Sequence, residues 1–150
     1  MVRIPKFVGY FAIVGGLVMI IAGTISFLLV QRELKDEKIT VADDAESFAG
    51  EPVEGPFTAY SQAMIIKVHA LESADGLTFA QLDREDPRRA SVQSSSFLRS
   101  SLFTSVLAFG VAVLVIGWGL LSILLGLALL ALDRRTTAAA PARVETAAAA

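Results

Sequence analysis

The sequence predicts an all-α membrane protein, a two-span transmembrane helical hairpin with a small helical extracytoplasmic cap. Residues 7–30 and 100–132 are runs of 24 and 33 residues without a charged side chain, and about 18 suffice for a membrane span. Hydrophobic residues make up 54% of the 150 residues, and the mean hydropathy is +0.61. So short a chain has too little remaining surface to hide two such helices in a soluble core.

The first run, residues 7–30, is predicted to be transmembrane helix 1, preceded by a cytoplasmic N-terminal tail of residues 1–6. Its basic start, MVRIPK, resembles the first part of a secretory signal peptide. The apolar part of a signal peptide is about 7–15 residues long and ends at a small-residue cleavage site. This run is longer and has no A-x-A pattern at its end, which favours an uncleaved anchor.

Residues 102–132 are predicted to form transmembrane helix 2, whose first turns lie outside the bilayer. The whole second run of 33 residues would make a helix of about 50 Å, whereas the hydrocarbon layer is about 30 Å thick. The excess must therefore emerge from the membrane. Residues 133–150 are Ala-rich and of low complexity, which predicts a disordered cytoplasmic tail.

Small residues recur every seven positions in both runs, so they share one face of each helix. In lipid, such faces let two helices approach closely, and van der Waals contact then drives association. The pattern predicts either a packed antiparallel pair or the docking of one face on a partner helix. The plain alternative is that Gly and Ala are common in membrane spans. The predicted packing residues are Gly9, Ala12, Gly16, Gly23, Ser105, Ala112, Gly119 and Gly126.

The charge distribution predicts a multi-pass protein of the cell (plasma) membrane with both termini cytoplasmic and the loop extracytoplasmic. The loop, residues 31–101, has a net charge of −5, and the two tails together have a net charge of +3. Positive residues in short flanks favour the cytoplasmic side. Four basic residues of the loop also lie near span ends, but loops longer than about 60 residues translocate largely regardless of charge.

The extracytoplasmic loop, residues 31–101, is predicted to be an organised cap with helices at about 57–73 and 79–86. Pro56 suits a first helical position, and the T-x-x-Q pattern at Thr78 resembles a capping box. Apolar residues spaced by three and four form one helix face. This face is predicted either to pack on the second cap helix and the emerging end of span two, or to dock on a neighbouring protein or the lipid interface. Its residues are Phe57, Tyr60, Met64, Val68 and Leu71.

No enzyme chemistry is predicted, and no catalytic, cofactor-binding or metal-ligating residue is assigned. The chain has no cysteine and a single histidine, His69, which excludes thiolate chemistry and a two-histidine iron site. His69 lies beside the polar face of its helix and is predicted to be a surface residue. The acidic residues at 43–46 and 83–86 lack EF-hand spacing and are interpreted as solvated. The spans hold no Asp, Glu, Lys, Arg or His, which argues against a proton-coupled transporter.

Four segments carry a family resemblance: KITVADDAESFAG, EPVEGPFTAYSQAMII, TFAQLDREDP and SFLRSSLFTSVLAFGVA. Together they resemble a family of small actinobacterial two-span membrane proteins without an assigned role. The resemblance implies two spans around an extracytoplasmic loop and no mechanism. Similar proteins sometimes carry the label "aromatic ring-opening dioxygenase", but this chain lacks the metal ligands that such an activity needs.

The predicted function is that of a non-enzymatic accessory or stabilising subunit of a larger envelope or respiratory membrane complex. Docking would use the cap and the small-residue helix faces. The expected partners are the lipid bilayer and other membrane protein subunits, and no nucleic acid. The alternative is a homo-oligomeric pore or transport component lined by Ser26, Ser105 and Ser122; a homo-oligomer therefore stays open.

Overall fold

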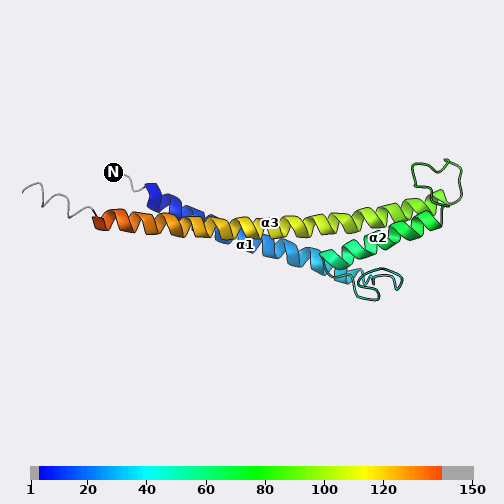
Figure 1. Cartoon of the computed structure of the whole chain (residues 1–150), viewed down its shortest axis with the longest axis horizontal. Coiled ribbons are helices and arrows are strands. Elements are labelled where there is room, and N and C mark those ends of the chain that lie inside the picture. The colour runs from blue at the N-terminus through cyan, green and yellow to red at the C-terminus, as the bar shows by residue number, and fades with distance from the viewer. Residues whose placement is uncertain (1–3, 140–150) are drawn as a thin grey trace, which may run out of the picture. The chain divides into compact units, whose positions relative to one another are not determined.

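The computed structural model describes the backbone of residues 4–139 and the side chains of residues 6–134. This part of the chain folds into three helices, α1 (Ile4–Asp36), α2 (Pro56–Glu72) and α3 (Arg89–Ala139), and contains no strand (Figure 1). One isolated antiparallel bridge joins Thr40 to Pro52. The fold is thus all-helical.

Two of the helices are long and apolar enough to cross a membrane, over Lys6–Asp36 and Arg89–Arg134. Only 11% of the most apolar window of each is buried within the protein. A core helix of a soluble protein would have most of this window buried, and leaving so much apolar surface in water is unfavourable. The two helices therefore indicate a membrane protein.

The chain divides into two compact units, and both long helices contribute to each. The first unit combines Met1–Thr24 with Val113–Ala150, and the second is Ile25–Ala112. In the first unit α1 and α3 pack through glycines. The second unit contains the main hydrophobic cluster and all of α2.

The main cluster of the second unit joins the end of α1, the following loop, α2 and α3. Phe27 of α1 packs on Phe109 of α3 with the ring centroids 4.7 Å apart. The loop adds two valines that are almost fully buried. Burying these apolar side chains is what holds the connecting segment, residues 37–88, on the long helices. The buried members are Leu34, Val41, Val53, Ala59, Ala63, Leu102 and Phe109.

Local sequence and hydrogen bonds define both ends of helix α2. Pro56 occupies the first turn, where its missing N–H costs nothing. The Thr58 hydroxyl accepts hydrogen bonds from the backbone N–H groups of Glu54 and Gly55, each at 3.2 Å. At the other end the Gly76 N–H donates to the Leu71 carbonyl at 2.7 Å, and Gly76 has a φ of +82°, which glycine adopts without strain.

The short helix predicted over 79–86 is wrong, because this segment forms a series of turns. The T-x-x-Q contact does form, since the Thr78 N–H donates to the Gln81 side chain at 2.9 Å. The carbonyls of Phe79 and Leu82, however, accept hydrogen bonds from the Arg89 guanidinium. Guanidinium N–H groups thus occupy acceptors that a continuing helix would use.

Both long helices extend beyond the predicted spans. Helix α1 begins at Ile4, inside the tail predicted for residues 1–6. Helix α3 continues to Ala139, so the first seven residues of the tail predicted to be disordered, 133–150, are helical. Four of these seven residues are arginine or alanine, which are good helix formers. Residues 140–150 lie outside the described residues.

Candidate functional site

The first candidate surface is the face of small residues between α1 and α3 in the first unit. A Cβ atom added to Gly16 would lie 2.5 Å from the carbonyl oxygen of Gly119. In return, a Cβ atom on Gly119 would lie 2.7 Å from the carbonyl oxygen of Gly16. No real Cβ tolerates such distances, so the two backbones can approach this closely only because both residues are glycine.

The same contact repeats one heptad away. A Cβ atom on Gly126 would lie 2.6 Å from the carbonyl oxygen of Gly9, and a Cβ atom on Gly9 would lie 3.0 Å from that of Gly126. Gly15 and Gly117 lie off this face, and a Cβ on either would meet nothing within 4 Å. Of the remaining residues predicted for packing, Gly23 and Ala112 are buried, and Ala12 and Ser105 are half-buried.

The second candidate surface is the apolar stripe of α2. Four of its five predicted residues are exposed: Phe57, Tyr60, Met64 and Val68, with Phe57 at 74%. Leu71 is half-buried. Tyr60 touches α3 through an edge-to-face contact with Phe103, with centroids 5.8 Å apart. Apart from this contact and the half-buried Leu71, the stripe faces outward.

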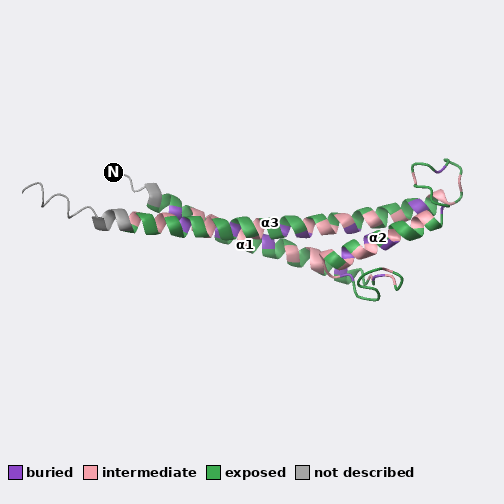
Figure 2. Ribbon diagram, viewed as in Figure 1, coloured by how far each residue is buried: buried purple, intermediate pink, exposed green. Residues whose placement is uncertain are grey.

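A different face of α2 packs against the rest of the second unit. Ala59 and Ala63 have no exposed surface, and Ile66 packs on the same cluster. In Figure 2 buried and exposed segments alternate along α2. The expectation that the stripe forms the internal packing surface is therefore wrong for most of its length. Small alanines allow the helix axes to approach more closely than the bulky stripe would.

The polar side of α2 holds the loop that follows α1. The Gln62 side-chain oxygen accepts a hydrogen bond from the Ala42 N–H at 2.9 Å. The Ser61 hydroxyl donates to the Ser47 carbonyl at 2.6 Å. His69 Nε2 lies 2.6 Å from Asp44 Oδ2, and this hydrogen bond lowers the pKa of the Asp44 carboxyl below its usual value. His69 thus fastens a loop, and it lies on the protein surface.

The Asp44–His69 contact predicts a small dependence of stability on acid pH. Because the pKa of Asp44 is lower in the folded state, its carboxylate stabilises the fold above the ordinary carboxyl pKa of about 4, and this contribution is lost as the pH falls below it. We expect Asp44→Asn to lower the melting temperature at pH 7, and this difference from the wild type to shrink as the pH falls below about 4 and through the lower pKa of the folded state. Asp43→Asn is the control and should show no such difference. Parallel melting curves for Asp44→Asn and Asp43→Asn would contradict this assignment.

Arg88 joins the turn after α2 to the start of α3. Its guanidinium makes ion pairs with Asp75 at 2.6 Å and with Asp86 at 2.9 Å. The hydrogen bond from Arg88 lowers the pKa of Asp86, and the two carboxylates raise the pKa of Arg88. Both carboxylates are therefore paired with a positively charged side chain of the protein itself.

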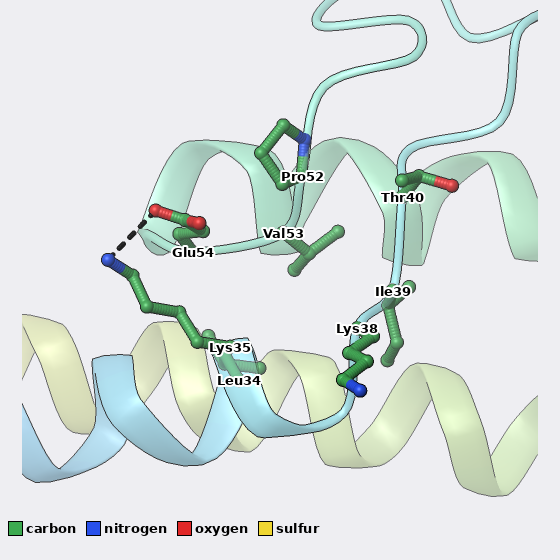
Figure 3. Close-up of a pocket in the computed structure, with 8 residues that line it drawn as sticks. All are labelled: Leu34, Lys35, Lys38, Ile39, Thr40, Pro52, Val53 and Glu54. Carbon is green, nitrogen blue, oxygen red and sulfur yellow. Dashed lines mark ion pairs between the residues drawn. The ribbon is translucent and has the colours of Figure 1, made fainter.

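An open pocket of about 300 Å³ lies where α1 ends (Figure 3). Its apolar wall includes Leu34 and Val53, and Lys35 and Lys38 lie at its rim. Lys35 Nζ forms an ion pair with Glu54 at 3.0 Å.

Within the part of the chain that the structure describes, no three His, Asp or Glu side chains gather where they could hold a metal ion. Comparisons with protein-family models, curated proteins and solved structures find no match to this chain. The resemblance to the actinobacterial family therefore stays a prediction.

Two features of the second unit are absent from the predictions made from sequence. The packing face of α2, with Ala59 and Ala63, is one of them, although alanines spaced by four residues could have indicated it. The other is Arg99, whose buried Nε atom has no hydrogen-bond partner. No local pattern in the sequence marks it, because its surroundings come from three separate segments.

Proposed function

We propose that this chain is a non-enzymatic accessory or stabilising subunit of a larger membrane complex, and that it docks through the exposed stripe of α2. The observation that carries the proposal is the exposure of Met64 and Val68 on a helix that already buries another face. A contiguous apolar surface outside the lipid is typical of a protein–protein contact.

Contacts in the second unit support a level for the bilayer surface. Phe27 and Phe109 lie side by side on antiparallel helices. Three residues further along α1 is Val30, the last residue of the first charge-free run. Three residues earlier on α3 is Val106, which is therefore level with it. We take this level as the edge of the hydrocarbon layer, beyond which the headgroups add about 5–7 Å.

The outer part of the stripe lies beyond the headgroups. Tyr60 contacts Phe103, about one helical turn outside Val106. From there α2 runs antiparallel to α3, side by side with it (Figure 1). Val68 follows Tyr60 by eight residues, about 12 Å of helix. Lipid can cover Phe57 and Tyr60 but not Val68, which supports a protein partner for the outer half.

The proposal includes a two-span hairpin in the plasma membrane, with the connecting segment as an outer cap and both termini cytoplasmic. The net charge of +3 in the tails and −5 in the loop supports this orientation. The glycine faces of the first unit are occupied by each other, so of the two surfaces predicted for docking the stripe of α2 is the one left for a partner. A pore of several copies finds no comparable support.

Replacing Val68 with glutamate tests the docking surface. A carboxylate in the centre of an apolar interface would be buried without a partner, which costs several kcal/mol. Because Val68 is exposed in the isolated chain, the variant should still fold. We expect partners that co-purify with the wild type in mild detergent to be lost with Val68→Glu. Mass spectrometry of the purified complex and circular dichroism of the variant are the measurements.

Gln93→Glu serves as the matched control, because it adds the same charge at an exposed polar position of α3. It should keep the partners. Equal recovery with Val68→Glu and Gln93→Glu would show that the stripe is not the docking surface. If the wild type retains only copies of itself, and Val68→Glu dissociates them, the stripe joins identical chains and the homo-oligomeric alternative replaces the proposal.

A further inference from the structure

Exposed aromatic side chains surround the start of α2. Phe57 lies in the first turn of α2, and Phe48 lies in the loop before it. Both are exposed, and both line one open hollow of about 330 Å³. Tyr60, also exposed, follows Phe57 by three residues, about one helical turn. Water is an unfavourable surrounding for so much apolar surface, so these rings require another medium or a partner.

Contacts of the hollow support a headgroup depth for the two phenylalanines. Gln31 lines the same hollow and directly follows Val30, whose level we take as the hydrocarbon edge. In Figure 3 the Lys35 side chain points back along α1, and its Nζ atom lies 3.0 Å from Glu54, two residues before α2 begins. The start of α2 therefore lies close to the edge, at the level of the layer of about 5–7 Å that headgroups occupy.

The contact of Tyr60 with α3 supports the same depth. Its ring packs edge-to-face on Phe103, which precedes Val106 by three residues, or about 4.5 Å of helix. Tyr60 is thus level with the headgroups as well. Tyrosine suits this layer, because one end of its side chain is apolar and the other is polar.

The backbone at Phe48 indicates that its exposure is not a by-product of packing. Its φ is +61°, an unfavourable conformation for a bulky residue, which glycine would adopt at lower cost. Hydrogen bonds on both sides hold the loop in this form. The Ser61 hydroxyl donates to the Ser47 carbonyl at 2.6 Å, and the Glu51 N–H donates to the Phe48 carbonyl at 3.0 Å. Such strain typically marks positions where a side chain contacts a ligand or surface.

We propose that Phe48, Phe57 and Tyr60 insert into the headgroup layer and anchor the cap on the lipid surface. The three rings are uncharged, so the contact does not depend on the charge of the headgroup. The inference rests on the membrane placement in the proposed function, but not on the protein partner. It assigns the inner end of the stripe to lipid and leaves the outer half, with Val68, for a protein.

Tryptophan fluorescence in proteoliposomes tests this depth. The purified full-length chain is reconstituted alone in phosphatidylcholine that carries a nitroxide quencher, either on the headgroup or in the middle of the acyl chain. Phe57→Trp, Phe48→Trp and the matched control Val68→Trp are each made together with Trp118→Phe. Val68 follows Phe57 by eleven residues. Because this is about 16 Å of helix, we expect the headgroup quencher to reduce the fluorescence of Phe57→Trp and Phe48→Trp about threefold more than that of Val68→Trp.

The wild type provides the reference for the bilayer through its single tryptophan, Trp118. It follows Val106 by twelve residues, about 18 Å of helix, which is near the middle of a layer about 30 Å thick. If the acyl-chain quencher reaches Trp118 but the headgroup quencher affects Phe57→Trp and Val68→Trp equally, the lipid anchor is overturned and the membrane placement stands. Failure of the acyl-chain quencher to reach Trp118 would overturn both.

A third result would replace lipid with a second copy of the chain. Circular dichroism first establishes that each variant is as helical as the wild type. If Phe57→Trp is then protected from both the headgroup quencher and dissolved acrylamide, the ring is covered by protein. Since no other protein is present in the vesicles, this result would overturn the lipid anchor in favour of contact between identical chains.

Discussion

Gly16→Ala is expected to lower the free energy of unfolding by about 1–3 kcal/mol, the usual cost of overpacking a close contact. The added methyl carbon would lie 2.5 Å from the Gly119 carbonyl oxygen and 2.7 Å from Ile123 Cγ1. The nearest obstacle is backbone, which cannot rotate away as a side chain can. The two helices must therefore separate along this face, with loss of the neighbouring contacts. Unfolding in a graded detergent mixture, followed by circular dichroism, measures the change.

Gly15→Ala is the matched control, one residue earlier on the same helix. A Cβ atom there meets nothing within 4 Å, and alanine is the better helix former by about 0.5–1 kcal/mol. The two variants should therefore change stability in opposite directions. A similar stability for Gly15→Ala and Gly16→Ala would mean that α1 and α3 do not pack through this face.

Leu102→Ala is expected to destabilise the second unit by about 2–5 kcal/mol, as is typical of a large-to-small change in a packed core. Leu102 is 4% exposed and belongs to the cluster that includes Leu34, Val53 and Ala63. Its removal leaves a cavity where α2, α3 and the loop meet. Hydrogen exchange should then accelerate at the Val53 and Val41 amides, whose backbone hydrogen bonds depend on the loop remaining packed.

Leu98→Ala makes the same chemical change one turn earlier on α3, where the leucine is 55% exposed. Its effect should lie within about 0.5 kcal/mol of the wild type. A loss of stability with Leu98→Ala as large as with Leu102→Ala would indicate that burial in an assembly, rather than burial in this chain, determines the cost.

The helical class and the long apolar helices could be predicted from sequence because both depend on local composition. A charge-free run of 24 residues has few alternatives to a span. The seven-residue glycine spacing could also be read locally, and the structure places Gly9, Gly16, Gly119 and Gly126 in close contact. The identity of the opposing glycine could not be predicted, since it depends on how the connecting segment folds.

The error at residues 79–86 has a tertiary cause. The T-x-x-Q pattern is a local signal, and its contact forms. What prevents the helix is Arg89, whose guanidinium lies 4.1 Å from the centre of the Phe79 ring and hydrogen-bonds to carbonyls in the segment. A side chain from outside the segment decides its conformation, and local propensity cannot anticipate this.

The predicted stripe of α2 illustrates a different limit. Helical periodicity in the sequence identifies the apolar faces of a helix. Helix α2 has two such faces, one of bulky residues and one containing Ala59, Ala63 and Ile66. A hydrophobicity count favours the bulky face, whereas the structure buries the face with the alanines. Periodicity alone cannot state which face meets a neighbouring helix, because that choice depends on the available space between helix axes.

The glycine contacts between α1 and α3 are alike and recur every seven residues. Sliding one helix by seven residues would bring Gly16 opposite Gly126 instead of Gly119, with glycine again against glycine. The repeat therefore holds the helices together without choosing among offsets that differ by one heptad. That choice falls to side chains that differ from one heptad to the next, such as Ile123, which lies against Gly16, and Leu130, which lies against Gly9. Some residues thus hold the two helices together, and different residues of the same helices fix their offset along the axis.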